Sequence, residues 1–380
     1  MLDVSNYIKK KQYKKAYMAA YRAILKKDKS AYKVMGDLYY NGYYVLQNYE
    51  QAYSYYEKGV EVLDYNAVVS AAVMLLNGNF VKRDLEAAYK LFLEAFDNKA
   101  IDSAFYLGYM TLHGLGCIES YNEAEHLFLI GKSRKEATSV YALANLYFKN
   151  ENISNNYLKA IELYKEAAAL GSIRAMIKLS DFYYNGVYVE QDYDKSIYYS
   201  KLAVESGDID SLVFLGDTYY YGYGVDISYK EAYKYYKKAF DLGYKKAFNR
   251  IADMYYFGQY IKKNTSLSYE YYKEASSCNE SEEASYAYFC MGKMKYYGEG
   301  INQDYVEAIK LFKSAIKAYD IGIAHLFLGK CYVHGFGVDI DLNKGYQELK
   351  TAEAMGDIDV EENLLSELMV DASGNVIYKN

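Results

Sequence analysis

Gly-x-Gly motifs are the first feature of this sequence whose residue type and spacing could support chemistry, because such a motif can open a backbone cradle for phosphate. Four are present, at residues 114–116, 222–224, 298–300 and 335–337. None continues into the third glycine of a dinucleotide-binding loop, and no strand pattern precedes any of them. Each lies at the same point of a longer repeating pattern, so we interpret them as turns rather than as phosphate sites.

Histidine and cysteine are the other residue types that could hold a metal ion or attack a substrate. The sequence has four of each, at His113, His126, His325, His334, Cys117, Cys278, Cys290 and Cys331. Zinc needs three or four ligands that converge on one point, and these residues show neither a Cys-x-x-Cys pair nor another metal-ligand spacing. Gly-x-Ser-x-Gly and His-Glu-x-x-His signatures are also absent. The sequence therefore predicts no catalytic residue, no metal site and no cofactor.

The composition is that of a folded, tyrosine-rich chain without proline. Of 380 residues, 52% are hydrophobic and 25% are charged, and 52 are tyrosines. This apolar content excludes intrinsic disorder, and the absence of a run of 18 apolar residues argues against a membrane-spanning helix. The start of the chain lacks the apolar core of a secretory signal, so we expect a cytoplasmic protein with reduced thiols.

The charge is unevenly distributed. The whole chain has a net charge of −6, yet its first 33 residues carry ten basic and two acidic side chains. A basic end of this kind could contact phosphate or an anionic membrane surface, and the alternative is a solvated terminal helix. No nucleic-acid-binding motif accompanies the charge, so no nucleic-acid partner is expected.

A repeat of 36 residues decides the architecture. Glycine recurs at this interval at residues 42, 78, 114, 186, 222 and 258, and the series continues at residues 298 and 335. Three further columns, which lie six residues before and ten and seventeen residues after these positions, hold only Gly, Ala or Ser. Small residues let neighbouring helix backbones approach closely, so every unit makes the same close crossing. We predict two helices per unit, such as residues 31–42 and 48–59 in the first.

The repeated residues resemble a known family. Segments such as FLGDTYYYGYGVD (214–226) and EAYKYYKKAFDLG (231–243) are similar to the two halves of the Sel1-like repeat, a relative of the tetratricopeptide repeat. The resemblance implies an all-α, right-handed superhelical solenoid of stacked antiparallel helix pairs. Nine units are expected over residues 31–356, with starts near 31, 67, 103, 139, 175, 211, 247, 287 and 324. A basic half-repeat or cap (1–30) precedes them, and an acidic capping helix and tail (357–380) follow.

The resemblance also directs the search for a site to the first helices, which line the concave face in tetratricopeptide relatives and bind partner peptides there. One variable column follows the small residue of each first helix. It reads Asp37, Val73, Tyr109, Asn145, Asp181, Asp217, Asp253, Lys293 and Lys330. The three successive aspartates predict an acidic stripe for a basic partner segment. The partner-binding residues expected are Asp181, Asp217, Asp253, Tyr221, Phe257, Lys178, Arg250 and Asn145.

We therefore expect a monomeric, non-enzymatic scaffold or adaptor that holds a partner protein or peptide on its concave surface. Two alternatives remain open. Some cysteine-rich Sel1-like relatives are described as binding or hydrolysing β-lactams, but their paired cysteines have no counterpart here, so that chemistry transfers to no residue. The other alternative is a protein that associates with a surface through its basic end. The interpretation of the column as solvated also predicts that leucine is more disruptive at Gly216 than at Asp217.

Overall fold

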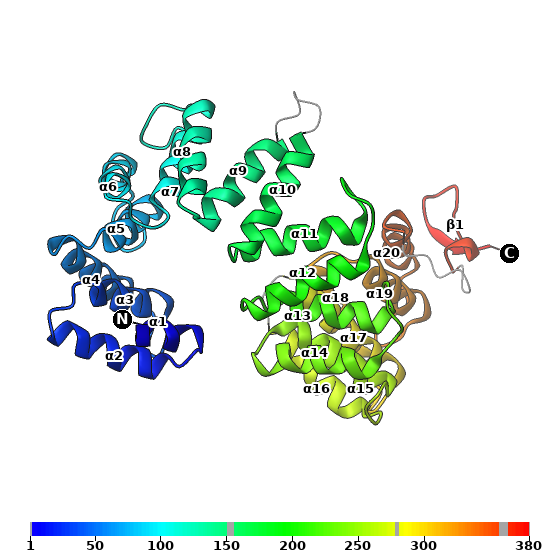
Figure 1. Ribbon diagram of the computed structural model, residues 1–380. Coiled ribbons are helices and arrows are strands. Elements are labelled where there is room, and N and C mark those ends of the chain that lie inside the picture. Colours follow the sequence, from blue (N-terminus) through cyan, green and yellow to red (C-terminus); the bar gives the residue numbers. More distant parts are fainter. Residues whose placement is uncertain (1, 150–155, 278–280, 357–363, 380) are drawn as a thin grey trace. The chain divides into compact units, whose positions relative to one another are not determined.

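A computed structural model describes residues 2–149, 156–277, 281–356 and 364–379. Its helices follow one another as antiparallel neighbours along the chain (Figure 1). Two helices come first, α1 (Leu2–Lys9) and α2 (Tyr13–Leu25). The first helices of the repeats are α3 (Ser30–Asn41), α5 (Tyr65–Asn77), α7 (Ser103–Leu112), α9 (Ala137–Lys149), α11 (Ile173–Asn185), α13 (Asp210–Tyr221), α15 (Lys245–Phe257), α17 (Glu282–Tyr297) and α19 (Gly322–His334).

The second helices of the repeats are α4 (Tyr49–Glu61), α6 (Leu85–Asp97), α8 (Tyr121–Ser133), α10 (Asn156–Ala169), α12 (Tyr193–Glu205), α14 (Tyr229–Asp241), α16 (Thr265–Ala275), α18 (Tyr305–Ala318) and α20 (Leu342–Ala354). The predicted all-α architecture of stacked helix pairs is confirmed. The chain forms two compact units, Met1–Asp192 and Tyr193–Asn380, and each is described by itself.

The ends of the helices follow from local sequence. Five second helices begin after a residue whose side chain accepts a hydrogen bond from the backbone N–H three residues later, namely Asn48, Asp84, Ser120, Ser228 and Asp304. The repeating glycine ends most first helices in the left-handed conformation, as at Gly42 (φ 69°) and Gly222 (φ 77°). This conformation is costly for residues with a Cβ, so the 36-residue period of glycine is a requirement of the turn.

The second turn position keeps its conformation even where glycine is lost. Tyr44, Phe80 and Tyr188 have φ values of 69°, 68° and 68°, close to the 70° of Gly224. Replacement of this glycine by an aromatic residue therefore leaves the turn conformation unchanged at these three positions. Packing of the aromatic rings compensates the strain in part, since Tyr44 lies 5.4 Å from the Tyr17 ring between centroids.

The three small-residue columns lie at helix crossings. An added Cβ at Gly216 of α13 would stand 2.3 Å from the ring of Tyr236 of α14, and one at Gly59 of α4 would stand 2.4 Å from Ala67 of α5. The first contact lies within a repeat and the second joins consecutive repeats. Each column therefore fixes one kind of crossing, and apolar residues from both helices close around it to form the core.

The C-terminal end differs from its prediction. Residues 357–363 of the expected capping helix lie outside the described residues, and the rest is not an α-helix: a 3₁₀ turn (η1, Leu364–Glu367) leads into a hairpin of β1 (Leu368–Val370) and β2 (Val376–Tyr378). The hairpin still covers the end of its unit. Leu364, Leu368 and Val376 are buried in one cluster with residues of α19 and α20, and the Val376 N–H donates to Asn343 (2.9 Å).

Candidate partner-binding site

The predicted column of variable residues is largely an internal hydrogen-bonding column. Its members on four first helices accept a hydrogen bond from the tyrosine hydroxyl that stands nineteen residues later on the second helix. The pairs are Tyr56–Asp37 (2.9 Å), Tyr164–Asn145 (2.7 Å), Tyr236–Asp217 (2.7 Å) and Tyr272–Asp253 (2.5 Å). Each tyrosine ring is buried, so its hydroxyl needs an acceptor inside the repeat.

Four further members of the column follow the same rule, and Asp181, which has Ser200 nineteen residues later, is the exception. Where the second helix carries Phe92, Phe128, Phe312 or Leu349 instead of tyrosine, the column holds Val73, Tyr109, Lys293 or Lys330. No hydroxyl is present there, and no acceptor carboxylate or amide stands opposite it. This pairing at a spacing of nineteen residues is visible in the sequence once the two columns are compared, and it was the signal that the sequence analysis missed.

Arg250 neutralises the part of the predicted acidic stripe that lies in the C-terminal unit. Its guanidinium makes two hydrogen bonds to Asp217, with Nε–Oδ1 2.7 Å and Nη2–Oδ2 3.1 Å, and its Nη1 lies 4.0 Å from Asp253. The exposed fractions of the Arg250 and Asp217 side chains are 25% and 22%, and Asp253 is 7% exposed. The prediction that Asp217 and Asp253 are solvated is therefore wrong. Asp181 belongs to the N-terminal unit and is exposed.

Asp253 lies in a cluster of buried polar groups. Its Oδ1 accepts from the hydroxyls of Tyr272 (2.5 Å) and Tyr286 (2.9 Å), and burial raises its pKa to about 6 against the opposing effect of these hydrogen bonds. Burial also raises the pKa of the nearby Cys290 thiol to about 12. The Asp253 carboxyl and the Cys290 thiol therefore lose their protons at a higher pH than free aspartate and cysteine side chains do.

Lowering the pH from 7 to 5 should stabilise the wild-type protein by roughly 1 kcal/mol more than the Asp253→Asn variant. The reason is that the folded state binds a proton on Asp253 below about pH 6, whereas the unfolded chain binds it only below about pH 4, so stability falls as pH rises between these values. Urea unfolding at both pH values measures the difference. His325, whose pKa is raised by hydrogen bonds to Glu348 and Asp320 although burial lowers it, contributes equally to both proteins. Equal pH slopes would contradict the assignment.

The remaining predicted residues keep exposed or partly exposed surfaces. Tyr221 and Phe257 are 48% and 59% exposed, at the ends of α13 and α15. Lys178 of α11 lies over the rings of Phe148 and Phe182, 5.6 and 5.0 Å from their centroids. Asn145 also lines a groove, where it lies among residues that were not predicted as partner-binding residues.

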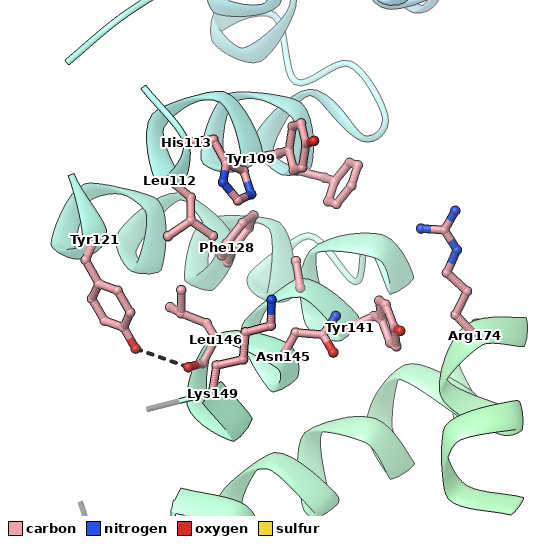
Figure 2. A pocket seen from close by; sticks show the side chains of 12 residues that line it. Tyr109, Leu112, His113, Tyr121, Phe128, Tyr141, Asn145, Leu146, Lys149 and Arg174 are labelled. Carbon is pink, nitrogen blue, oxygen red and sulfur yellow. Dashed lines mark hydrogen bonds between the residues drawn. The ribbon is translucent and has the colours of Figure 1, made fainter. Parts of the chain in front are cut away.

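This groove, called the aromatic groove below, lies in the N-terminal unit and has a volume of about 930 Å³. Its lining residues come from α7, α8, α9 and α11, and are Phe105, Tyr109, Leu112, His113, Tyr121, Phe128, Tyr141, Ala142, Asn145, Leu146, Lys149 and Arg174. Figure 2 shows Tyr109 of α7 and His113, the residue that follows α7, on one side of the hollow, with Tyr141, Asn145 and Lys149 of α9 on the other. The first helices of two consecutive repeats therefore form its walls.

Ring packing positions the wall on α7. The Tyr109 ring lies 4.8 Å from the His113 ring and 6.2 Å from Phe105, measured between centroids. Below them Phe128 of α8 packs against Gly108, where an added Cβ would stand 2.5 Å from the ring. Tyr109 nevertheless stays 39% exposed, so this wall offers aromatic surface that the fold itself does not cover.

The polar groups of the aromatic groove are nitrogen donors. Asn145 accepts from Tyr164 through Oδ1, so its amide nitrogen points into the hollow (Figure 2). Lys149 and Arg174 are exposed at the rim, and the twelve described lining residues include no acid. Tyr121 donates through its hydroxyl to the Leu146 carbonyl (3.3 Å) and closes one end. The groove thus combines aromatic walls with a few positively charged or donor groups.

Metal ligands and reactive thiols are the two kinds of group that the sequence raised as candidates for chemistry. Within them, no group of three or more His, Cys, Asp or Glu side chains could hold a metal ion. Cys117, Cys290 and Cys331 are free thiols, and Cys278 lies outside the described residues. Burial raises the pKa of Cys331, like that of Cys290, to about 12, which disfavours the nucleophilic thiolate.

The helix pairs and their repeated crossings define an α/α repeat protein. The family pattern described as the Sel1 repeat matches nine segments, at residues 30–61, 69–99, 101–131, 137–172, 173–208, 209–244, 246–280, 285–320 and 322–357. The chain therefore belongs to the Sel1 repeat family, and the predicted number of nine repeats is confirmed. A comparison with curated proteins finds no significant match.

One solved structure of low sequence identity shares the fold. A protective antigen present in uropathogenic Escherichia coli strains, which displays an SLR fold, is 22% identical with a TM-score of 0.50, and the match covers 93% of this chain and 83% of that chain. A Sel1 repeat protein from Oxalobacter formigenes is 21% identical with a TM-score of 0.48, and the match covers 63% and 98%. In the part of the chain that the structure describes, no helix combines the length and apolar character needed to cross a membrane.

Proposed function

We propose that the protein is a non-enzymatic, cytoplasmic adaptor that binds a segment of a partner protein in the aromatic groove. The observation that carries this proposal is a hollow of about 930 Å³ between first helices, lined by aromatic side chains that the fold leaves partly exposed. Interfaces are enriched in tyrosine and phenylalanine because these rings bury a large area at a small cost in conformational entropy. The buried thiols support the non-enzymatic part of the proposal.

The walls of the aromatic groove would make apolar contacts with the partner segment, and its polar groups would make hydrogen bonds and ion pairs. The rings of Phe105, Tyr109 and Tyr141 would bury an apolar side chain of the partner, and each fully buried side chain of this kind contributes about 1.5–3 kcal/mol. Asn145, Lys149 and Arg174 would orient the segment through its carbonyl or carboxylate oxygens. Micromolar affinity, about −8 kcal/mol, needs only a few such contacts beyond the cost of association.

The position of the site differs from the acidic stripe expected from the sequence. In the C-terminal unit Asp217 and Asp253 already accept hydrogen bonds from tyrosines, and Arg250 supplies their cation. A partner lysine would have to compete with these internal bonds. In the aromatic groove, no acidic side chain among the described lining residues would compete with a partner for Lys149 and Arg174.

A photo-crosslinking amino acid at position 109 tests the proposal in living cells. We expect covalent adducts to one or a few polypeptides from Tyr109 in α7, and at least tenfold less adduct from the same group at Leu129 in α8, which is 44% exposed outside the groove. The double variant Tyr109→Ala/Tyr141→Ala should weaken binding of the captured partner at least tenfold, about 1.4 kcal/mol, whereas Leu129→Ala should leave it unchanged. Equal adducts from both positions would contradict a site in the groove.

A further inference from the structure

A second hollow in the N-terminal unit has the opposite charge. This acidic groove has a volume of about 500 Å³ and is lined by residues of the first helices α3, α5 and α7, together with a few neighbours. Among its described lining residues, three carry carboxylates, Asp37, Asp64 and Asp102, and one carries a basic side chain, Lys33. Val69 and Val73 of α5 supply apolar surface beside them. Ligand pockets of this size hold a single side chain or small molecule with ease.

Asp64, one of the residues that line this groove, has a carboxylate oxygen without a hydrogen-bond partner. Its Oδ1 accepts from the Asn66 N–H (3.2 Å) and caps α5, but its Oδ2 is buried without a hydrogen-bond partner, and the whole residue is only 7% exposed. Burial raises the pKa of Asp64, even though the charges of Lys33 and Lys29 act in the opposite direction. A buried carboxylate with an unpaired oxygen is costly unless a cation or donor compensates it.

The one basic side chain in the lining is already engaged. Lys33 Nζ lies 2.6 Å from Asp37 Oδ2, and the other oxygen of Asp37 accepts from Tyr56 (2.9 Å). Asp102 accepts from the Thr138 hydroxyl through Oδ1 (2.6 Å). The described lining of the acidic groove therefore has an excess of negative charge. Among its carboxylate oxygens, Oδ2 of Asp64 is buried without a hydrogen-bond partner.

We propose that the acidic groove binds a lysine or arginine side chain of the partner segment. The aliphatic stem would lie along Val69 and Val73, and the charged head would reach the Asp64 carboxylate, since such side chains combine an apolar stem with a cationic tip. This inference deepens the proposed function, on which it rests, by naming a residue that the partner must carry.

Tyr106 of α7 interacts electrostatically with a residue of each groove. Tyr106 lines the acidic groove, and its ring stacks on Phe92 with 4.7 Å between centroids. Burial and the charge of Asp102 raise the pKa of Tyr106. The charge of Arg174, at the rim of the aromatic groove, acts in the opposite direction. A partner segment that places an apolar side chain in the aromatic groove would thus extend its basic residue toward α3 and α5, which line the acidic groove.

The experiment titrates the full-length protein with N-acetyl-arginine methylamide and N-acetyl-lysine methylamide, followed by the methyl NMR signals of Val69 and Val73. The norleucine analogue has the same kind of stem without charge and should bind at least tenfold more weakly. Asp64→Asn should weaken binding of the cationic probes at least tenfold and keep the melting temperature, because asparagine caps a helix as well as aspartate does. Asp97→Asn, on the exposed end of α6, is the matched control and should change affinity less than twofold.

Equal binding of arginine and norleucine probes, or an unchanged affinity in Asp64→Asn, would overturn the cation site. These probes require no partner, so the result is separate from the crosslinking at Tyr109. A charge-dependent response without adducts at Tyr109 would contradict the proposed function and support the cation site. Adducts at Tyr109 without a charge-dependent response would contradict the cation site alone.

Discussion

Replacing Asp217 with alanine should destabilise the C-terminal unit by roughly 3 kcal/mol, the lower end of the ~3–5 kcal/mol found when one partner of a buried ion pair is removed. The variant leaves the Arg250 guanidinium, three-quarters buried, without its bidentate partner and leaves the Tyr236 hydroxyl without its acceptor. We place the cost at the low end because both charged side chains keep about a quarter of their surface in water. Urea unfolding followed by circular dichroism measures it.

The matched control is Asp181→Ala, at the same position of the repeat two helices earlier in the chain. Asp181 is exposed, and its carboxylate accepts a hydrogen bond from Asn185 on the same helix, so we expect a change within about 0.5 kcal/mol. A double variant, Asp217→Leu/Arg250→Leu, should recover part of the loss because no charge then stays buried alone. Equal stability of the two alanine variants would show that the Asp217–Arg250 pair contributes nothing.

The fold was predictable because its strongest determinants are periodic. The column of turn glycines, including Gly42 and Gly222, and the column of small crossing residues, including Gly59 and Gly216, each meet the same physical demand in every repeat. Their spacing therefore fixes the helix boundaries and the crossings together. The C-terminal hairpin has no such repetition, and its short strands depend on burial of residues such as Leu368 against α20, which local sequence alone does not reveal.

The proposed binding surface was harder to predict than the fold. Its composition depends on which polar side chains form no hydrogen bond or ion pair inside the protein. Asp217 and Asp181 occupy the same column, yet one is bound to Arg250 and Tyr236 and the other faces solvent. The distinction requires the second-helix residue nineteen positions later, Tyr236 or Ser200. The aromatic groove was missed for a related reason, since Tyr109 differs from the aspartates that drew attention to the column, although it occupies the same position.

Replacing Gly216 with leucine should unfold or severely destabilise the C-terminal unit. A Cβ alone would stand 2.3 Å from the Tyr236 ring, which is fully buried and held at its hydroxyl by Asp217. Overpacking typically costs about 1–3 kcal/mol, and we expect at least the upper value because the ring has no free space to enter. The loss should therefore equal or exceed that at Asp217. The expected ranking of the two sites is retained, but the gap is small, because Asp217 is not the solvated position that the sequence suggested.

Two variants separate this steric cause from a general effect of placing leucine on a helix of this unit. Lys201→Leu puts the same side chain on an exposed position of α12 and should change stability little. Gly216→Ala should fall between the two, since Ala252 already stands in the same column opposite Tyr272, so the repeat can accept one methyl group when the ring shifts. Urea unfolding and one-dimensional NMR would report the order Lys201→Leu, Gly216→Ala, Gly216→Leu. A Gly216→Leu protein with wild-type stability would contradict the close crossing on which the whole repeat depends.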